Sequence, residues 1–340
     1  MKTDKQPHVW NPIAETERLE ALDVMRGMAL FGVLMVNLLA GFRVSLFEHI
    51  LTFHTHPGWT NHVVDVLTAW LLEFKAFTLF SFLFGVGVGV QAERTRSRAI
   101  NLRRFLARRF LVLFVFGVVH ILLIWNGDIL TLYAICGLLL LPLVKKPVWL
   151  IITVGVGLIA LTYTPVFDVP FPTEASVRAH AAEATCIYSE GSYSEILMFR
   201  WRETKEFIAP LLINSLPKTY GLMLLGIASW RVDLFKRPTE NRGFLFTVLI
   251  GGGVLGAAST TLLVLAESTG VPTTLPPVLL NALSYIPLAF AIGAGLLLWL
   301  RCSSTGRMKR WLAGAGRMAL SNYLAQSVIF SVLFYGYGLG

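Results

Sequence analysis

The sequence predicts an all-α membrane protein, a polytopic helical bundle forming one domain over residues 1–340. Its 340 residues are 55% hydrophobic and only 14% charged, too few charged side chains to solvate a globular domain of this length. The apolar residues also occur in blocks of about 18 or more, long enough to cross a bilayer as helices. Such helices bond every backbone polar group internally, as lipid requires, and the alternating pattern of a β-barrel is absent from the sequence.

About nine spans are expected along the chain. They cover roughly residues 24–43, 74–92, 109–125, 128–144, 148–164, 214–230, 243–266, 278–300 and 318–340. Residues 63–73 are apolar but carry Asp65 and Glu73, which favours an interfacial helix or an extension of the second span. Residues 1–23 lack the apolar core and cleavage site of a signal peptide, so the first helix is expected to stay in the mature protein.

The basic residues predict the orientation. Of 29 Lys and Arg residues, 22 fall on the side of the N-terminus, which puts residues 1–23 in the cytoplasm by the positive-inside rule. The net charge of +9 therefore indicates cytoplasmic loops rather than nucleic-acid binding. The densest run, residues 94–109, is expected at the inner leaflet, as a topology anchor or as part of a ligand site.

The long extramembrane stretch, residues 165–213, is expected on the opposite, extracytoplasmic side. Three prolines open it, and a helical pattern follows near residues 193–208. Loops of this length are often functional. A cap over an external cavity and an ordinary surface loop both remain open.

Ionisable and polar residues inside the predicted spans are the first candidates for function, because such groups are costly in a bilayer. Asp23 and Arg26 are three residues apart on one helix face, where they are expected to pair. Asn37 lies deeper in the same helix, as a helix contact or a substrate contact. Lys75 starts the second span, which continues into Gly85, Gly87 and Gly89, a ladder typical of close helix packing.

The most informative segment is GVVHILLIWNGDILTLYAICG at 117–137. His120 lies in an apolar span, and Asp128 follows a Trp-Asn-Gly turn at the outer surface. A lone histidine is usually a satisfied core residue, but here an acid just across the turn makes a His–Asp pair easy to form. Histidine can act as a general base whose tautomer a carboxylate holds.

The last span contributes another polar group. Arg317 is expected at the inner interface, and Ser321, Asn322 and Gln326 follow on neighbouring turns, where interhelical hydrogen bonds are the simpler interpretation. His54 and His56 lie in the loop after the first span. Their spacing can chelate metal, but no Cys or acidic partner completes a recognisable set, so no metal is expected.

With these residues in place, the chain resembles the YeiB family of bacterial membrane proteins. The matching blocks are LDVMRGMALFGVLMVN (22–37), FKAFTLFSFLFGVG (74–87), RRFLVLFVFGVVHILLIWNGDILTLYAICGLL (108–139) and GRMALSNYLAQSVIFSVLFYGYGLG (316–340). They occur in the family's order and span nearly the whole chain. The resemblance implies a bundle of about ten transmembrane helices in the bacterial inner membrane.

The resemblance also implies a function. The family is grouped with transmembrane acyltransferases, including the heparan-glucosaminide acetyltransferases and acyltransferase family 3, which carry acyl groups from cytoplasmic acyl-CoA to an acceptor on the other side. The shared Asp-x-x-Arg-Gly start is Asp23, Arg26 and Gly27, and by similarity Asp23 and Arg26 line the acyl-donor tunnel. The other positions that match the family are Asn37, Lys75, His120, Asp128, Arg317 and Asn322.

Two departures from the family qualify this expectation. Heparan-type enzymes use a histidine in the loop after the first helix, so the catalytic assignment is divided between His54 or His56 and His120. The family also continues past GYGLG with another helix and a basic tail, whereas this chain stops at Gly340, as a truncated or a naturally short form. A missing last helix would expose one face of the bundle.

The leading hypothesis is therefore an acyl-CoA-dependent or acetyl-CoA-dependent transmembrane acyltransferase. His120 oriented by Asp128, or else His54 or His56, would deprotonate an unknown extracytoplasmic acceptor, and Arg26 would hold the CoA phosphates. The alternatives are a transporter or flippase for a polar solute or lipid headgroup, and a catalytically silent membrane scaffold. The expected partners are membrane lipids, and the small-residue ladder is compatible with a homodimer.

Overall fold

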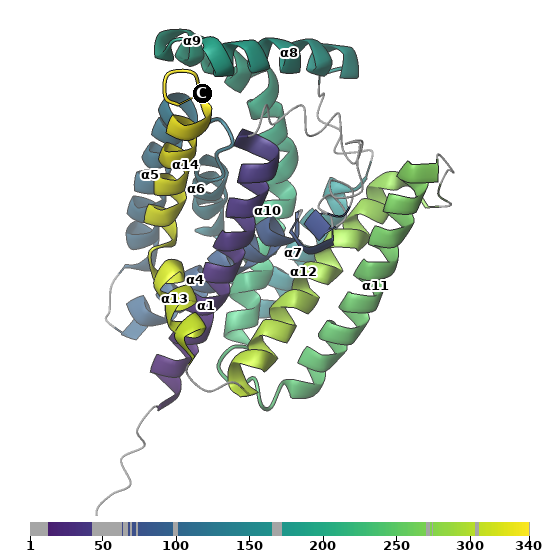
Figure 1. The fold of residues 1–340 in the computed structure, drawn as a ribbon. Helices are drawn as coiled ribbons and strands as arrows, with labels where there is room; N and C mark the ends of the chain where they lie inside the picture. Colours follow the sequence, from purple (N-terminus) through teal and green to yellow (C-terminus); the bar gives the residue numbers. More distant parts are fainter. Residues whose placement is uncertain are drawn as a thin grey trace, which may run out of the picture.

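The computed structural model describes residues 13–42, 63, 67–68, 70–72, 74–97, 101–164, 172–269, 273, 275–302 and 306–339. They form a bundle of helices that two further helices cross at one end (Figure 1). The α-helices are α1 (Ile13–Val36), α4 (Lys75–Ser97), α5 (Leu102–Val119), α6 (Leu130–Leu140), α7 (Val148–Thr162), α8 (Glu174–Glu190), α9 (Tyr193–Glu203), α10 (Ala209–Arg231), α11 (Arg242–Thr269), α12 (Pro277–Cys302), α13 (Arg307–Arg317) and α14 (Ala319–Phe334). Short π-helical segments continue three of the chain's helical stretches, at η1 (Asn37–Phe42), η2 (His120–Ile124) and η4 (Thr204–Ile208).

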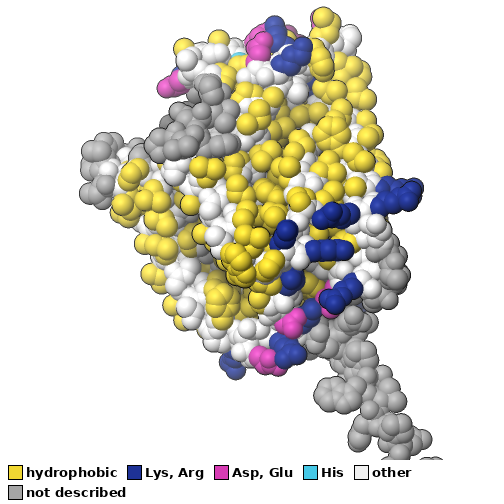
Figure 2. Space-filling view, turned by 180° about the vertical axis from the view of Figure 1, so that it is seen from behind, with side chains coloured by type: hydrophobic (Ala, Val, Ile, Leu, Met, Phe, Trp, Pro, Cys, Tyr) yellow, Lys and Arg dark blue, Asp and Glu magenta, His cyan; other side chains and the backbone are white. Residues whose placement is uncertain are grey.

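These helices form an all-α integral membrane bundle. Within the described residues, six helical stretches are long and apolar enough to cross a membrane, and three shorter apolar helices, α6, α7 and α14, occupy the remaining predicted spans. Large apolar side chains project outward from α5, α7 and α11, among them Val115, Trp149 and Val254. Figure 2 shows this apolar surface as a broad band, with basic side chains gathered below it. An outward apolar belt of this extent suits lipid rather than water.

Helix α10 is the centre of the bundle and packs against both α4 and α7. Glycines permit the close approach. A Cβ at Gly226 would meet the carbonyl oxygen of Phe82 on α4, and a Cβ at Gly85 would meet the backbone of Met223 on α10. Small residues let helix backbones approach in a membrane, where dispersion contacts replace the hydrophobic effect as the driving force. The glycine ladder of α4 therefore serves helix packing at Gly85.

The two ends of the bundle differ in character. The cap end is the end crossed by α8 and α9, and the basic end is the opposite one, where α13 packs beside α1 (Figure 1). At the cap end, Ser192 and Glu195 form a capping box that starts α9, and Thr173 caps α8. The helical pattern expected near residues 193–208 is present as α9 and η4, whereas α8 was not anticipated.

The first turns of α5 differ from the expected spans. The helix begins at Leu102 instead of residue 109, so residues 102–109 of the basic run lie on α5, and residues 94–97 belong to the end of α4. Asn101 caps this start, because its side chain accepts a hydrogen bond from the Arg104 N–H at 3.2 Å. Leu102, Leu106 and Phe110, spaced four apart, are buried on one face. Hydropathy alone overlooked these turns because the arginines on the other face masked the apolar stripe.

Candidate functional site

His120 and Asp128 meet where α5 ends and α6 begins. At His120 the α-helix α5 is followed by the π-helical segment η2, and a short turn then leads to Leu130. Asp128 Oδ1 accepts from the N–H of Leu130 at 3.1 Å, and Oδ2 accepts from that of Thr131 at 2.7 Å. The carboxylate thereby caps the first turn of α6, which fixes its position.

The imidazole of His120 is held beside this carboxylate. Its Nδ1 lies 3.0 Å from Asp128 Oδ1, with both side chains fully buried, although the angle falls outside hydrogen-bond geometry. Within the described part of the chain, His120 Nε2 has no hydrogen-bond partner. A carboxylate beside Nδ1 favours the tautomer that carries its proton there, which leaves the Nε2 lone pair able to accept one. The pair therefore has the arrangement of a histidine base and its orienting acid.

Tyr323 of α14 encloses the pair. Its ring lies 5.1 Å from the His120 ring, and its hydroxyl donates to the Gly127 carbonyl oxygen at 3.0 Å. The same hydroxyl accepts from the N–H of Ile129 at 3.3 Å. One buried side chain from the far end of the sequence therefore holds the turn that carries Asp128.

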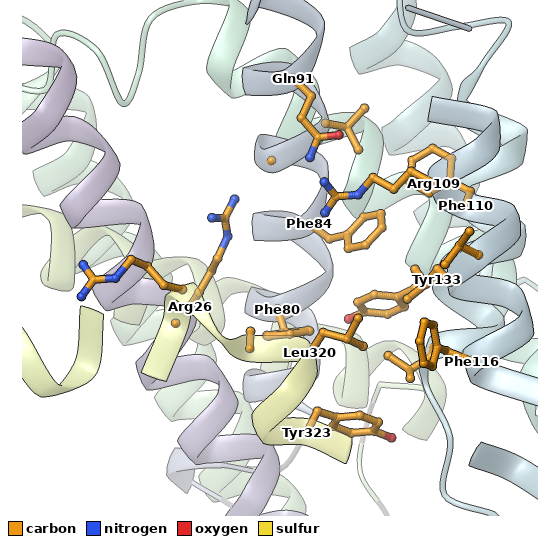
Figure 3. Close-up of a pocket in the computed structure, with 18 of the residues that line it drawn as sticks. Arg26, Phe80, Phe84, Gln91, Arg109, Phe110, Phe116, Tyr133, Leu320 and Tyr323 are labelled. Carbon is orange, nitrogen blue, oxygen red and sulfur yellow. The ribbon is translucent and has the colours of Figure 1, made fainter. Parts of the chain in front are cut away.

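A large cavity, here called the arginine cavity, opens at the basic end. It has a volume of about 730 Å³, and four arginines line it, namely Arg26, Arg108, Arg109 and Arg317. Its inner part is aromatic, and Figure 3 shows Phe80, Phe84 and Tyr133 between the polar side chains of Gln91 and Arg109 and the ring of Tyr323. The cavity therefore combines a cationic mouth with an apolar interior that ends at Tyr323.

The position of the Arg26 guanidinium depends on the absence of a side chain at Gly87. A Cβ at Gly87 of α4 would lie 2.7 Å from Arg26 Nη2, so any side chain there would push the guanidinium away. Asp23 holds the other side of Arg26 at 3.3 Å. Among the described residues, Arg26 is the one arginine of this cavity that pairs with a carboxylate. The cavity mouth therefore carries an excess of positive charge.

A second cavity, here called the cap cavity, lies at the cap end. It has a volume of about 280 Å³ and is mainly apolar. Its polar lining residues are Asn37, Asn126, Asp128, Ser215 and Lys218. The two cavities approach each other at the start of α6: Gly127, Asp128, Ile129 and Leu132 line the cap cavity, whereas Leu130 and Tyr133 line the arginine cavity. A wall of a few residues separates them, and His120, which lines neither cavity, contacts Asp128 of the one and Tyr323 of the other.

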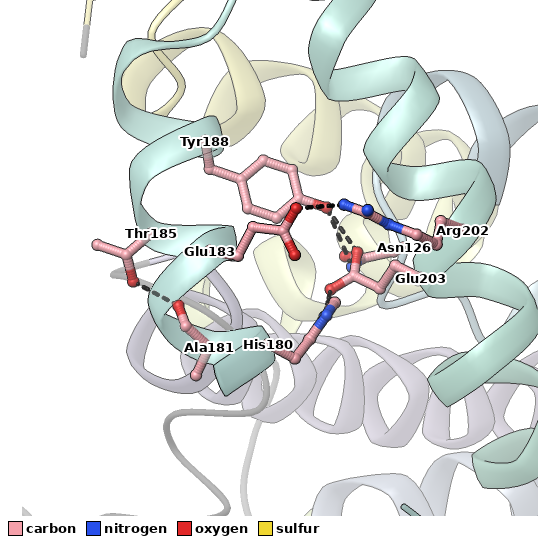
Figure 4. Close-up of polar contacts among 8 residues, drawn as sticks. All are labelled: Asn126, His180, Ala181, Glu183, Thr185, Tyr188, Arg202 and Glu203. Atoms are coloured by element: carbon pink, nitrogen blue, oxygen red, sulfur yellow. Dashed lines mark hydrogen bonds and ion pairs between the residues drawn. The ribbon is translucent and has the colours of Figure 1, made fainter. Parts of the chain in front are cut away.

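The helices of the cap end hold this wall through a buried polar network. Glu203 of α9 accepts from the Tyr188 hydroxyl at 2.6 Å and from the side-chain amide of Asn126, and its other oxygen lies 2.8 Å from His180 Nε2 (Figure 4). Burial, and then the Glu203 carboxylate, raises the pKa of Tyr188 well above its usual value, so its hydroxyl stays protonated and donates. Asn126 belongs to the same turn as Asp128, so α8 and α9 are anchored to that turn.

The structure places the positions that match the family in different surroundings. Arg26 and Arg317 line the arginine cavity, whereas Asn37 lines the cap cavity. Asp23 pairs with Arg26 as expected but lines neither cavity. Successive residues of an α-helix are rotated by about 100° about its axis, so Asp23 and Arg26 share a face only approximately. Only the longer side chain, that of Arg26, reaches the cavity.

Other candidates have structural partners or lie elsewhere. Lys75 is buried and lines neither cavity, and the Asn322 side chain donates to the Ala315 carbonyl oxygen at 3.0 Å, which ties α14 to α13. His54 and His56 lie outside the described residues. Within those residues no cluster of ligands suits a metal ion.

Sequence reasoning overlooked Glu203, His180 and Lys218. Lys218 had a recognisable signal, because it is an ionisable residue inside a predicted span. Glu203 and His180 had none, because in a loop of mixed composition nothing distinguishes a buried carboxylate from a solvated one before the partners are known.

Comparisons with known proteins confirm the resemblance predicted from the blocks above. A family described as "Protein of unknown function (DUF418)" matches residues 229–340. The uncharacterized protein YxaH of Bacillus subtilis is 29% identical over 366 aligned residues, covering 97% of this chain and 84% of that protein. The uncharacterized protein YeiB of Escherichia coli is 29% identical, covering 95% of this chain and 85% of that protein. No solved structure matches the chain.

Proposed function

Because the chain is a YeiB-like multi-pass membrane protein, we propose that it transfers an acyl group from cytoplasmic acyl-CoA to an acceptor on the other side of the membrane. One observation carries the proposal. Two cavities from opposite ends of the bundle meet at one short turn, and a buried His–Asp pair adjoins that turn. A transmembrane transfer needs this arrangement, in which donor and acceptor enter separately and react at a common wall.

The orientation follows from the charges of the two ends. The basic end faces the cytoplasm in this proposal, because cytoplasmic segments of membrane proteins are rich in Lys and Arg. That end carries the start of α5 and all of α13, with Arg103, Arg104, Arg307 and Arg310 in addition to the cavity arginines. The arginine cavity is then open to cytoplasmic acyl-CoA, and the cap cavity faces the extracytoplasmic side.

The arginine cavity suits an acyl-CoA donor in charge and in shape. Its volume of about 730 Å³ falls in the usual range of small-molecule sites. Guanidinium groups form bidentate contacts with phosphates, and three of the four arginines lack a carboxylate partner within the described residues. The aromatic interior provides an apolar environment for the acyl and pantetheine part. In this orientation the thioester end points toward Tyr323 and the wall.

The reaction is an acyl transfer with His120 as general base. A hydroxyl or amine of the acceptor attacks the thioester carbonyl carbon while His120 Nε2 takes its proton. The new bond to the acyl carbon forms, the carbon–sulfur bond breaks, and the proton leaves with the thiol of CoA. Asp128 stabilises the imidazolium form between these steps, since it lies 3.0 Å from Nδ1. Small shifts of Tyr323, which covers His120, would admit the reactants.

Calorimetric titration of the purified full chain in lipid nanodiscs tests donor binding. Acetyl-CoA should bind the unchanged protein, and Arg109→Met together with Arg317→Met should weaken binding about tenfold or more, because two phosphate contacts are lost. Arg310→Met is the matched control. Arg310 is an exposed arginine of the same end that does not line the cavity, so its loss should leave binding unchanged. Equal binding by all three proteins would remove the arginine cavity as the donor site.

Transfer of a radiolabelled acetyl group in membrane vesicles tests the chemistry. His120→Ala should abolish labelling of the acceptor while acetyl-CoA binding persists, because His120 does not line the arginine cavity. Labelling that survives in His120→Ala would remove His120 from the mechanism. Movement of a solute across the vesicle membrane without thioester consumption would instead favour a transporter.

A further inference from the structure

Lys218 of α10 lines the cap cavity and is held there by aromatic groups. Its Nζ donates a hydrogen bond to the Tyr285 hydroxyl at 3.2 Å. It also lies 5.1 Å from the ring centroid of Tyr285, 5.6 Å from that of Phe74 and 5.8 Å from that of Phe77. The faces of aromatic rings attract cations, which offsets part of the cost of burying the ammonium group of the lysine.

The charge of Lys218 has no acidic counterpart in the described part of the protein. No Asp or Glu there lies within ion-pair distance of Nζ, and its hydrogen-bond partner among the described residues is the neutral phenol of Tyr285, which also bonds Tyr163. Asp128, the acid of the cap cavity, already has its two oxygens engaged by His120 and by two backbone N–H groups. A cation inside a membrane protein is costly unless an anion or water compensates it.

A second donor faces the same cavity. Asn37, the first residue of η1, has a buried side-chain N–H₂ group with no hydrogen-bond partner among the described residues. Buried polar groups are normally paired, so an orphaned donor in a cavity wall points to a ligand acceptor. An ammonium and an amide donor, contributed by two helices to one cavity, are suited to a group that accepts hydrogen bonds and carries negative charge.

We propose that the cap cavity binds an anionic group, a phosphate or a carboxylate, with Lys218 as its counter-ion and Asn37 as a hydrogen-bond donor. The volume of about 280 Å³ suits a headgroup or a single small solute, and the apolar lining suits the carbon skeleton attached to it. This inference rests on the proposed function, in which the anionic group belongs to the acyl acceptor. The acceptor is therefore an anionic molecule whose reacting hydroxyl or amine lies beside Asp128. Its source is a lipid headgroup or a free solute.

The full chain in neutral detergent provides the test. Calorimetry measures binding of glycerol phosphate, glycerate and uncharged glycerol, and native mass spectrometry measures retention of phosphatidylglycerol. The variants are Lys218→Met, which removes the charge, and Lys218→Arg, which keeps it. Lys205→Met is the matched control, because Lys205 is an exposed lysine of the cap end that lies over the Trp201 ring and outside the cavity.

The expected result is binding of an anionic probe but not of glycerol, with affinity about tenfold lower in Lys218→Met and nearly retained in Lys218→Arg and Lys205→Met. Binding of glycerol phosphate or glycerate indicates a soluble source, and Lys218-dependent retention of phosphatidylglycerol alone indicates a lipid. Equal behaviour of the unchanged protein and Lys218→Met toward every anionic probe, or no binding at all, overturns the proposal.

The same samples separate this inference from the proposed function. Acetyl-CoA binding should be unchanged in Lys218→Met, because Lys218 does not line the arginine cavity. Lys218-dependent anion binding without any acetyl-CoA binding would refute the acyltransferase and leave the anion site standing. Acetyl-CoA binding and transfer that proceed without a Lys218-dependent anion would refute the anion site alone.

Discussion

His120 Nδ1 lies 3.0 Å from Asp128 Oδ1, and both side chains are completely enclosed. They are eight positions apart in the sequence, and the interruption of α5 by η2 and the following turn brings them together. Because Asp128 also caps α6, its carboxylate keeps its position whether or not the histidine is charged.

Asp128→Asn should reduce acyl transfer about a hundredfold or more, since a neutral amide does not stabilise the imidazolium form of His120. The amide oxygen still accepts hydrogen bonds, so α6 should remain capped and the protein folded. Acetyl-CoA binding should also persist. Transfer rate, calorimetry and a thermal melt on one preparation check these three expectations, and an unchanged transfer rate would contradict the role of the carboxylate.

Tyr323→Phe should destabilise the turn at residues 127–129. Two half-buried backbone groups, the Gly127 carbonyl and the Ile129 N–H, lose their partner, at a cost of about 1 kcal/mol each. A lower melting temperature and slower transfer are expected together. Tyr220→Phe is the comparison, because it removes a bond to the Leu139 carbonyl oxygen, away from the turn, and should leave the transfer rate unchanged.

Glu203→Ala should destabilise the cap end strongly. The substitution leaves His180, Tyr188 and Asn126 without their shared partner, and breaking a buried charged network typically costs about 3 to 5 kcal/mol. Glu174→Ala on α8 is the control. It breaks an exposed pair with Arg178, which should change stability by about 0.5 kcal/mol or less. Denaturation monitored by circular dichroism compares the two variants, and equal midpoints would show that the network is not structural.

Gly226→Val should prevent the packing of α10 against α4. Its Cβ would meet the Phe82 carbonyl oxygen, which belongs to a helix backbone and has no freedom to move aside. Overpacking of this kind costs about 1 to 3 kcal/mol or more. Gly157→Val on α7 should be tolerated, because nothing lies within 4 Å of the added carbon. The yield of monodisperse protein after detergent extraction measures the difference, and similar yields would argue against close α4–α10 contact.

Much of the candidate site was accessible from local sequence. The His120–Asp128 pair was predictable because a turn of known residues lies between them, and the Asp23–Arg26 pair because residues three apart are neighbours on a helix surface. The joining of Arg26 to Arg108, Arg109 and Arg317 was not predictable, since those residues come from three helices distant in sequence. The Glu203 network likewise joins α8, α9 and the turn after α5.

By itself, the sequence determined the class of the protein, its apolar helices and the sign of the charge at each end, because length and hydropathy decide what crosses a bilayer. Only the tertiary structure decided that Arg26 and Asn37 of one helical stretch line different cavities and that Lys218 lines the same cavity as Asn37. The physical reason is that a membrane helix is apolar on its lipid face and on its buried face alike. Its rotation is therefore set by close contacts such as Gly226 against Phe82, which the residue pattern does not reveal.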